Sequence, residues 1–181
     1  MKLSQLVAET EKLSRNEFVT RFPTPALLFG EPLSARRSID SDLARPAEDL
    51  DQIYELTDAY SLDPPPASKP PRFGVESRVE FLPANPAAGE TQEKLVTLGR
   101  APDSDLQVAA ISVSLTHAGF MLSAKGWSIV DAGSTNGTTL NGRALRGDEA
   151  ALLRDGDAIG FGRDTHAIYL SPGALFDRLR A

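Results

Sequence analysis

Three short clusters of polar residues hold the side chains of this sequence that are best suited to chemistry. The clusters are Gly99-Arg100, Ser114–His117 and Ser134–Thr138. The guanidinium of Arg100 offers a planar pair of donors that matches an oxyanion. Ser114 and Thr135 add hydroxyl groups, and Asn136 adds an amide that can donate and accept. These groups favour the binding of an anion such as phosphate, provided that the folded chain brings the three clusters together.

The clusters lie between short apolar runs that end in turn residues, which is the pattern of a β-sandwich. The expected strands are 73–82, 94–98, 106–108, 119–123, 127–131, 138–140, 151–153, 158–161 and 167–170. Asn136-Gly137 and Asn141-Gly142 are strong signals for tight turns. Ser171 and Pro172 predict the start of a last helix over residues 174–180. Because a sandwich gathers alternate loops at one end, distant loops can share one site.

The N-terminal part of the chain has a different pattern. Residues 1–33 are expected to form a partly helical arm, in which Ser14 and Glu17 fit a capping box. The apolar run 26–29 needs a surface to cover it, and either the C-terminal domain or another protein could supply that surface. Residues 34–71 are expected to be an acidic, proline-rich linker. Residues 72–181 are then assigned to the sandwich domain with its C-terminal helix.

Composition and charge narrow the class of protein. The chain has no cysteine, which excludes disulfides, thiolate metal sites and cysteine nucleophiles. It has two histidines, and no spacing suggests a metal site. A net charge of −6 argues against nucleic-acid binding, and no apolar run approaches the roughly 20 residues of a membrane helix. We therefore expect a cytoplasmic protein with no metal, no cofactor and no nucleic-acid or membrane partner.

Four ordered motifs resemble the forkhead-associated (FHA) domain family. The motifs are Leu98–Arg100, Ser114–His117, Asp131–Gly142 and Leu153–Gly162. The resemblance spans roughly residues 73–171. It implies a mainly β fold, an eleven-stranded β-sandwich that binds phosphothreonine peptides through loops at one end. Here that sandwich would carry a short C-terminal helix and follow a partly helical N-terminal extension.

The resemblance also implies roles for single residues. Arg100 and Ser114 are expected to contact the phosphate with help from Thr135. Asn136 is expected to hold the peptide backbone beside the phosphothreonine. The positions expected to keep the binding loops in shape are Gly99, His117 and Gly137.

Leu115 departs from the pattern of the family. The residue after the site serine is often Arg, Lys or Asn in the family, and such a residue can add a contact to the phosphate. A leucine side chain has no donor. We expect this departure to weaken phosphate binding or to change which peptides fit.

These observations predict a non-catalytic adaptor for protein–protein interaction in serine/threonine kinase signal transduction. Its expected partner is a threonine-phosphorylated protein or peptide. A serine/threonine kinase or its substrate is a candidate for that partner. The chain's own N-terminal arm is a further candidate partner, through phosphorylation of a threonine. The candidate threonines are Thr10, Thr20, Thr24 and, in the linker, Thr57.

Two other functions stay open. A scaffold or assembly protein could use the same fold without reading phosphate, and the apolar run 26–29 and Leu115 support that alternative. A hydrolase could use Ser114, His117 and Asp131 as a triad. The hydrolase is the weaker alternative, because the serine lacks a G-x-S-x-G elbow and residues three apart on a loop rarely align a hydroxyl with an imidazole.

Overall fold

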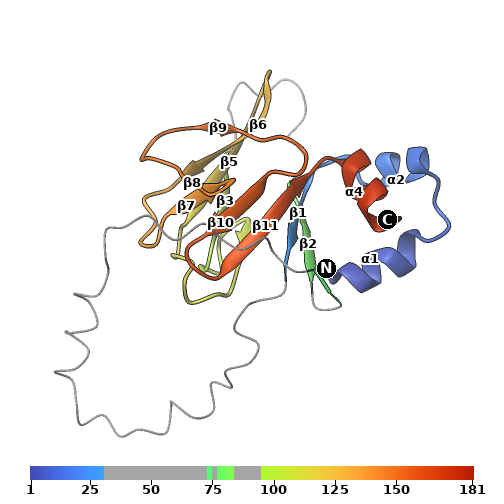
Figure 1. Cartoon of the computed structure of the whole chain (residues 1–181), viewed down its shortest axis with the longest axis horizontal. Coiled ribbons are helices and arrows are strands. Elements are labelled where there is room, and N and C mark those ends of the chain that lie inside the picture. Colours follow the sequence, from blue (N-terminus) through green and yellow to red (C-terminus); the bar gives the residue numbers. More distant parts are fainter. Residues whose placement is uncertain (31–72, 75–76, 84–94) are drawn as a thin grey trace, which may run out of the picture.

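The computed structural model describes residues 1–30, 73–74, 77–83 and 95–181, in which eleven strands form two sheets. The strands are β1 (Ala26–Phe29), β2 (Arg78–Phe81), β3 (Val96–Gly99), β4 (Leu106–Gln107), β5 (Ala118–Ser123), β6 (Gly126–Asp131), β7 (Thr138–Leu140), β8 (Arg143–Ala144), β9 (Ala151–Leu152), β10 (Ala158–Phe161) and β11 (Thr165–Leu170). The order is β2-β1-β11-β10-β7-β8 in one sheet and β4-β3-β5-β6-β9 in the other. Figure 1 shows the two sheets stacked as a sandwich. The mainly β, eleven-stranded sandwich predicted from the sequence is confirmed.

The main core lies between the two sheets. Leu98 and Phe120 from the five-stranded sheet and Leu27 and Phe161 from the six-stranded sheet belong to one buried cluster, and none of them is exposed. The rings of Phe120 and Phe161 meet edge to face with their centroids 6.5 Å apart. This cluster supports the strands from which the polar loops emerge.

Strand β1 comes from the segment that the sequence analysis placed in the N-terminal arm. It pairs antiparallel with both β2 and β11. Leu27 and Phe29 face the main core, whereas Ala26 and Leu28 pack in a second cluster on the other face of the sheet. Burial on both faces explains why four successive residues are apolar. The chain's own domain therefore covers this run, and the sandwich includes a strand that precedes the predicted linker.

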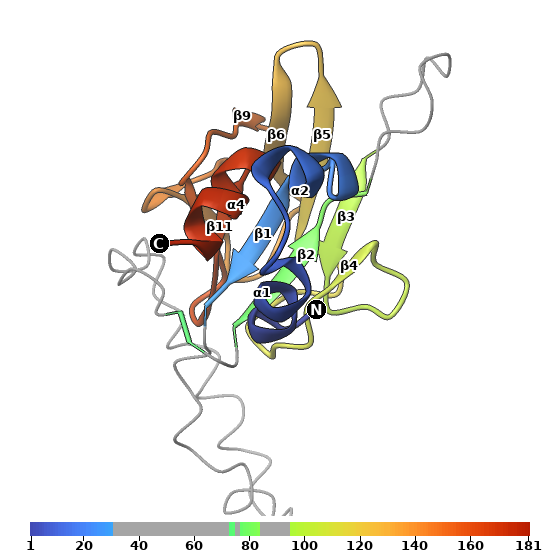
Figure 2. The ribbon, with the colours of Figure 1, turned by 90° about the vertical axis from the view of Figure 1, so that its right-hand side faces the viewer.

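Three short helices cover the outer face of the six-stranded sheet. They are α1 (Leu3–Thr10), α2 (Arg15–Arg21) and α4 (Pro172–Leu179), and together we call them the helical cap. Figure 2 shows the cap in front of β1, β2 and β11. Leu6, Phe18 and Leu175 are fully buried and pack in the same cluster as Leu28 and Val79. No helix in the described ranges has the length and apolar character needed to span a bilayer.

Several local predictions are confirmed. Ser14 and Glu17 form the predicted capping box at the start of α2. Asn141 and Gly142 form the two-residue turn between β7 and β8, with φ angles of 52° and 80°. The C-terminal helix begins two residues earlier than predicted, with Ser171 as its N-cap. Strand β8 was not predicted, because it is short and exposed and so has no apolar pattern. The predicted linker 34–71 lies outside the described residues.

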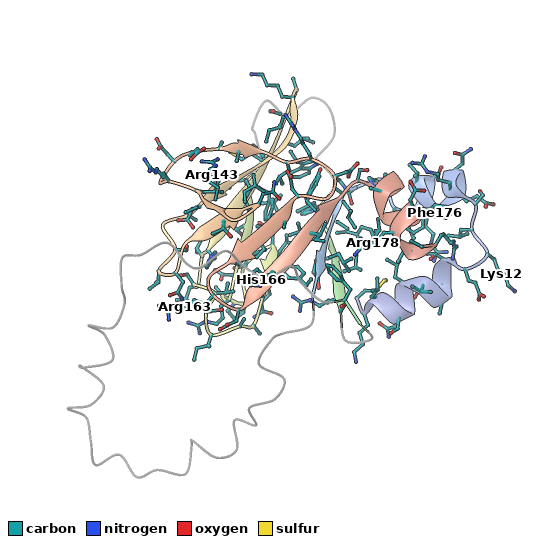
Figure 3. The ribbon with its side chains drawn as sticks, viewed as in Figure 1. Lys12, Arg143, Arg163, His166, Phe176 and Arg178 are labelled. Atoms are coloured by element: carbon teal, nitrogen blue, oxygen red, sulfur yellow. The ribbon has the colours of Figure 1, made fainter. Side chains whose placement is uncertain are left out.

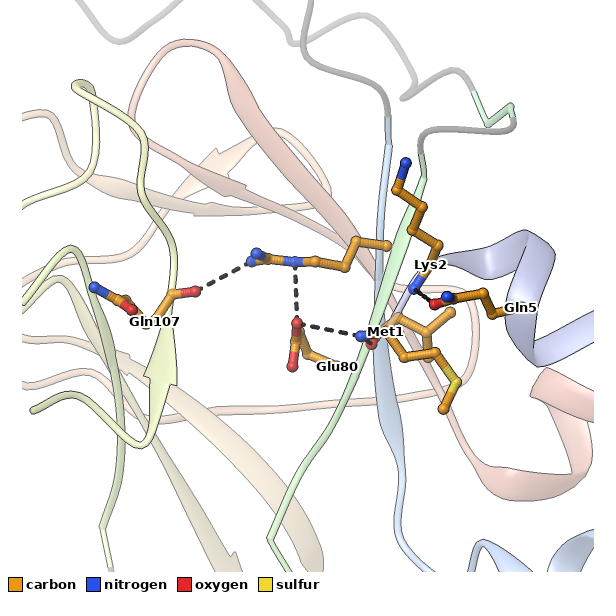
Figure 4. Close-up of polar contacts among 7 residues, drawn as sticks. Met1, Lys2, Gln5, Glu80 and Gln107 are labelled. Carbon is orange, nitrogen blue, oxygen red and sulfur yellow. Dashed lines mark hydrogen bonds and ion pairs between the residues drawn. The ribbon is translucent and has the colours of Figure 1, made fainter. Parts of the chain in front are cut away.

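Arg78 joins the two sheets at one edge of the sandwich. Its Nη2 donates to the backbone oxygen of Gln107 on β4 at 3.1 Å, and its Nε lies 3.0 Å from Oε1 of Glu80. Figure 4 shows these contacts together with the terminal amine of Met1, which lies 3.6 Å from the same carboxylate. The guanidinium also lies over the ring of Phe29. One side chain on β2 thus contacts both sheets.

We expect the substitution Leu27→Ala to lower the free energy of unfolding by about 2–5 kcal/mol, because it opens a cavity in the main core. Val7→Ala on the exposed side of α1 is the control, with an expected loss of less than about 0.5 kcal/mol. Urea unfolding followed by Trp127 fluorescence and circular dichroism measures both changes. Equal, small losses would show that residues 26–29 are not part of the folded domain.

Candidate functional site

The three polar clusters meet at one end of the sandwich, on three loops that hydrogen-bond to one another. The loops are β3–β4 (100–105), β4–β5 (108–117) and β6–β7 (132–137). Ser114 is the meeting point. Its backbone oxygen accepts from the N–H of Arg100 at 2.8 Å, and its Oγ accepts from the N–H of Thr135 at 3.0 Å. The tertiary structure thus supplies the convergence that sequence spacing alone could not show.

Arg100 is held by its inner nitrogen and is exposed at its outer end. Its Nε donates to the backbone oxygen of Val113 at 3.2 Å. Within the ranges that the structure describes, its terminal amino groups make no hydrogen bond and no ion pair. A guanidinium fixed at one nitrogen, with two donors facing solvent, is suited to bind an oxyanion.

The other predicted contact residues lie on the β4–β5 and β6–β7 loops. The Oγ of Ser114 lies 3.4 Å from Oγ1 of Thr135, so the two hydroxyls come from different loops to one point. Asn136 follows directly in the β6–β7 loop, and its Nδ2 donates to the backbone oxygen of Ser112 at 2.9 Å. This bond orients the amide of Asn136 across the gap between two loops. The four residues expected to contact the ligand therefore lie on adjoining loops.

His117 is the fully buried link between the β4–β5 and β6–β7 loops. Its Nδ1 accepts from the N–H of Ser114 at 3.0 Å, and its Nε2 lies 3.2 Å from the backbone oxygen of Gly137. Because Nδ1 accepts, Nε2 carries the proton and donates to Gly137. Burial lowers the pKa of His117, and it outweighs the opposing effects of the Gly137 hydrogen bond and of the Asp131 charge. The ring is therefore neutral, and it hydrogen-bonds to the backbone of both loops.

Asp131 shapes the β6–β7 loop from the end of β6. Its carboxylate accepts from the backbone N–H groups of Gly133 and Ser134, both at 3.0 Å, and from the hydroxyls of Ser134 and Thr138, both at 2.6 Å. Burial alone would raise the pKa of Asp131, but these hydrogen bonds outweigh it and the pKa is lowered. The carboxylate therefore stays ionised, and its oxygens are occupied by hydrogen bonds from its own loop and from Thr138.

Two glycines are required by the geometry of the loops. A Cβ on Gly99 would lie 1.9 Å from the backbone oxygen of Leu115, so any other residue would push the β3–β4 and β4–β5 loops apart. Gly137 has a φ of +77°, which L-residues with a side chain rarely adopt. Both backbone positions are therefore restricted to glycine, and their role in supporting a binding loop stays a prediction.

The geometry does not support the hydrolase alternative. His117 receives the backbone N–H of Ser114, not its hydroxyl, and its other nitrogen is bonded to Gly137. Neither ring nitrogen is therefore placed to take the proton of the serine.

Among the described residues no group of three or more His, Cys, Asp or Glu side chains could hold a metal ion.

Sequence reasoning missed two residues that build the site. Ser112 supplies its backbone oxygen to Asn136, and Thr138 supplies its hydroxyl to Asp131. The buried hydroxyl of Thr138 could have been suspected, because a threonine in a core-facing strand position needs a hydrogen-bond partner. The role of Ser112 leaves no signal in the sequence, since it uses only the main chain.

Comparisons with known proteins identify the family of the chain. The model of the FHA domain matches residues 96–162. The oxoglutarate dehydrogenase inhibitor of Corynebacterium efficiens is 30% identical over 127 residues, which cover 68% of this chain and 86% of that protein. The chain belongs to the FHA domain family. The motifs quoted from the sequence therefore lie in an FHA domain, and its loops 100–105, 108–117 and 132–137 form the candidate site.

Other relatives match the chain over a smaller part of their own length. The glycogen accumulation regulator GarA of Mycolicibacterium smegmatis is 33% identical, over 50% of this chain and 63% of that protein. The ABC transporter ATP-binding/permease protein Rv1747 of Mycobacterium tuberculosis is 35% identical, over 55% of this chain and 12% of that protein. Among solved structures, the N-terminal FHA domain of Saccharomyces cerevisiae Rad53p with a phosphothreonine peptide is 28% identical, covering 52% and 84% of the two chains with a TM-score of 0.47.

We expect NMR to show His117 mainly neutral at pH 6.5, with the proton on Nε2, because burial disfavours the charged ring. The unfolded chain takes up a proton near pH 6.5, whereas the folded chain does so only at lower pH. The contribution of His117 to stability is therefore complete above about pH 6.5 and declines as the pH falls below it. Long-range ¹⁵N–¹H correlation of the imidazole reads tautomer and charge. An imidazolium at pH 6.5, or a proton on Nδ1, would contradict the hydrogen bonds described.

Proposed function

We propose that this FHA domain is a non-catalytic adaptor that binds threonine-phosphorylated proteins. The observation that carries the proposal is that the loops of Arg100, Ser114 and Thr135 are hydrogen-bonded at one end of the sandwich, with the Arg100 guanidinium held by Val113, the residue before Ser114. The carboxylate of Asp131 is engaged by its own loop and by Thr138. A phosphate dianion needs several donors from different directions. Asn136 lies beside these donors and is suited to hold the backbone of the bound peptide.

The relatives support a regulatory role. Two of them are named as a regulator of glycogen accumulation and an inhibitor of oxoglutarate dehydrogenase. Each name describes control of another protein or process. By analogy, this chain would act in serine/threonine kinase signalling, with a kinase or its substrate as the phosphorylated partner. The cytoplasmic location expected from the sequence stays a prediction.

The structure narrows the alternatives that involve the N-terminal segment. The apolar run 26–29, which supported a phosphate-independent scaffold, is buried as β1 and is no free surface. Thr10, one of the arm threonines proposed as an internal ligand, is fully buried and donates to the backbone oxygen of Leu6 at 2.7 Å. A kinase could not reach it without opening the helical cap. Thr20 is exposed on α2, and Thr57 lies outside the described residues.

Arg100→Ala is expected to lower affinity for a phosphothreonine peptide by ten- to a hundredfold or more. The substitution removes a charge-assisted contact of about 1.5–3 kcal/mol. Calorimetric titration with phosphorylated and unphosphorylated forms of the same peptide measures the effect. Arg154→Ala is the matched control. Arg154 precedes the turn at Gly156, and the N–H of Gly156 donates to the backbone oxygen of Tyr169. This turn lies at the end of β11 away from the site. Equal binding of both forms of the peptide by the unchanged protein would refute the proposal.

Leu115→Arg is expected to raise affinity for the phosphorylated peptide by about five- to tenfold, because it adds a charged donor next to Ser114. The Leu115 side chain is 58% exposed, so a longer side chain fits without disturbing the core. A peptide with alanine on both sides of the phosphothreonine isolates this contact. Leu115→Gln, which adds length without charge, serves as the comparison. No gain with arginine would show that position 115 does not face the phosphate.

A further inference from the structure

The outer face of the five-stranded sheet carries four apolar side chains at its surface. Leu95 and Leu152 are 44% and 43% exposed, and Met121 and Val130 are half-buried. None of the four belongs to either buried cluster. The helical cap lies on the other sheet, as Figure 2 shows, so no helix in the described ranges covers these side chains. We call Leu95, Met121, Val130 and Leu152 the apolar face.

The strand register makes the apolar face continuous. Met121 on β5 lies opposite Ser128 on β6, and Ser128 lies opposite Leu152 on β9. Val130 is two residues further along β6 and therefore points to the same side of the sheet. The side of an antiparallel sheet that faces water normally carries polar side chains. An apolar patch in its place indicates an interaction surface.

The two leucines lie close against the sheet. A Cβ on Gly119 would lie 2.5 Å from Cδ1 of Leu95, so the leucine side chain lies across this glycine. Cδ1 of Leu152 lies 3.8 Å from the place that a Cβ on Gly126 would take. Glycines beneath the leucines thus keep the apolar face flat. A flat surface suits another flat surface, such as a second sheet.

The polar side chains on this side of the sheet already have hydrogen-bond partners. The hydroxyl of Ser128 donates to the backbone oxygen of Met121 at 3.4 Å. The hydroxyl of Thr97 donates to Oδ2 of Asp105 at 2.9 Å. A partner could therefore cover the apolar face without leaving these donors unpaired, which would otherwise oppose binding.

Opposite charges flank the apolar face at its two ends. Lys125 is exposed on the turn between β5 and β6. Asp103 and Asp105 are exposed at the other end of the strands, in the β3–β4 loop, and the carboxylate of Asp105 is fixed by Thr97. A half-turn about an axis parallel to the sheet and across its strands exchanges the two ends. The positive end of one face then lies over the negative end of an identical face, so the face is complementary to itself.

We propose that the apolar face binds a second copy of this chain, with the strands of the two copies antiparallel. Two sheets that pack face to face keep their strands within about 30° of each other. The same patch then serves both copies, as in a two-fold symmetric dimer. A parallel arrangement is disfavoured, because it would place the two Lys125 side chains at the same end.

The size of this side of the sheet predicts a weak dimer. Four strands about 4.8 Å apart and six residues of about 3.4 Å each give a surface of roughly 20 by 20 Å. That is about half of the ~800 Å² that each partner buries in a standard interface. We expect reversible association with a dissociation constant on the order of 100 μM.

The antiparallel arrangement points the two candidate sites away from each other, because the site loops lie at one end of each sandwich. A dimer of adaptors would therefore hold two phosphorylated partners at once. This consequence rests on the proposed function, whereas the dimer itself does not.

Sedimentation equilibrium of the full chain over about 5 to 500 μM, a range that brackets the expected constant, tests the dimer. Leu152→Asp places a charge in the apolar face. Val7→Asp is the matched control, because Val7 is an apolar side chain 37% exposed on α1. Lys125→Glu tests the orientation of the two copies. Urea unfolding followed by Trp127 fluorescence shows that each variant is folded.

The unchanged protein and Val7→Asp are expected to show the same monomer–dimer equilibrium. Leu152→Asp should weaken association by about a hundredfold or more and remain monomeric, because the dimer would bury two unpaired carboxylates. Lys125→Glu should weaken association by about threefold or more, because like charges then meet at both ends of the dimer. Added salt should reduce this last difference.

Three results would count against the inference. A protein that stays monomeric at every concentration would overturn it, and so would an association that Leu152→Asp leaves unchanged. An association lost in Leu152→Asp but unaffected by Lys125→Glu would overturn the antiparallel arrangement. Titration of Leu152→Asp with a phosphothreonine peptide keeps the proposed function separate, because a monomer should retain phosphate-dependent binding.

Discussion

The imidazole of His117 is the contact on which the candidate site depends. It is buried and neutral, and it joins the backbone of Ser114 to the backbone of Gly137 across two loops. A buried imidazole with both nitrogens bonded is stable in one orientation only, because an unpaired nitrogen would incur the desolvation cost of a lost hydrogen bond. The Ser114 hydroxyl, the Thr135 hydroxyl and the Asn136 amide therefore keep their relative positions before any ligand arrives.

The site separates groups that hold the loops from groups that remain available to a ligand. His117 and Asp131 make their hydrogen bonds within the domain, and their pKa values are shifted toward the charge states that those bonds require. Arg100 uses one nitrogen for positioning and leaves its outer end at the surface. Such preorganisation lowers the entropic cost of binding, since the loops need not be ordered by the ligand.

Figure 3 shows the turn between β10 and β11, marked by Arg163, at the end of the sandwich away from Phe176 in the helical cap.

The helical cap covers the outer face of β1, the first strand of the sandwich. Strand β1 is sandwiched between the main core and the cap, so both faces of the six-stranded sheet are buried at this point. The ion pair between Arg15 and Asp177 and the hydrogen bond from Arg180 to Thr10 connect the N-terminal helices to the C-terminal one. The two ends of the chain thus stabilise the same sheet. The cap covers the outer face of that sheet, and the loops of the site leave from strand ends.

The sequence by itself determined the features that depend on local chemistry. The Asn141-Gly142 turn follows from backbone angles that those residues tolerate, the capping box of Ser14 and Glu17 from a reciprocal hydrogen bond, and the candidate contact residues from the types of their side chains. Eight of the expected strand segments needed only small shifts of their ends, because each alternates or ends at turn residues.

Only the tertiary structure decided what depends on contacts between distant segments. The run 26–29 is a central strand because it pairs with residues 78–81 and 167–170, and no local pattern distinguishes a covered strand from a partner-binding segment. The backbone oxygen of Ser112 accepts the hydrogen bond of Asn136 only because folding brings the two together, since every residue carries such an oxygen. Ile111, which is 95% exposed, was equally hidden, because burial is a property of the packed chain and an apolar side chain in the sequence does not reveal which way its turn will face.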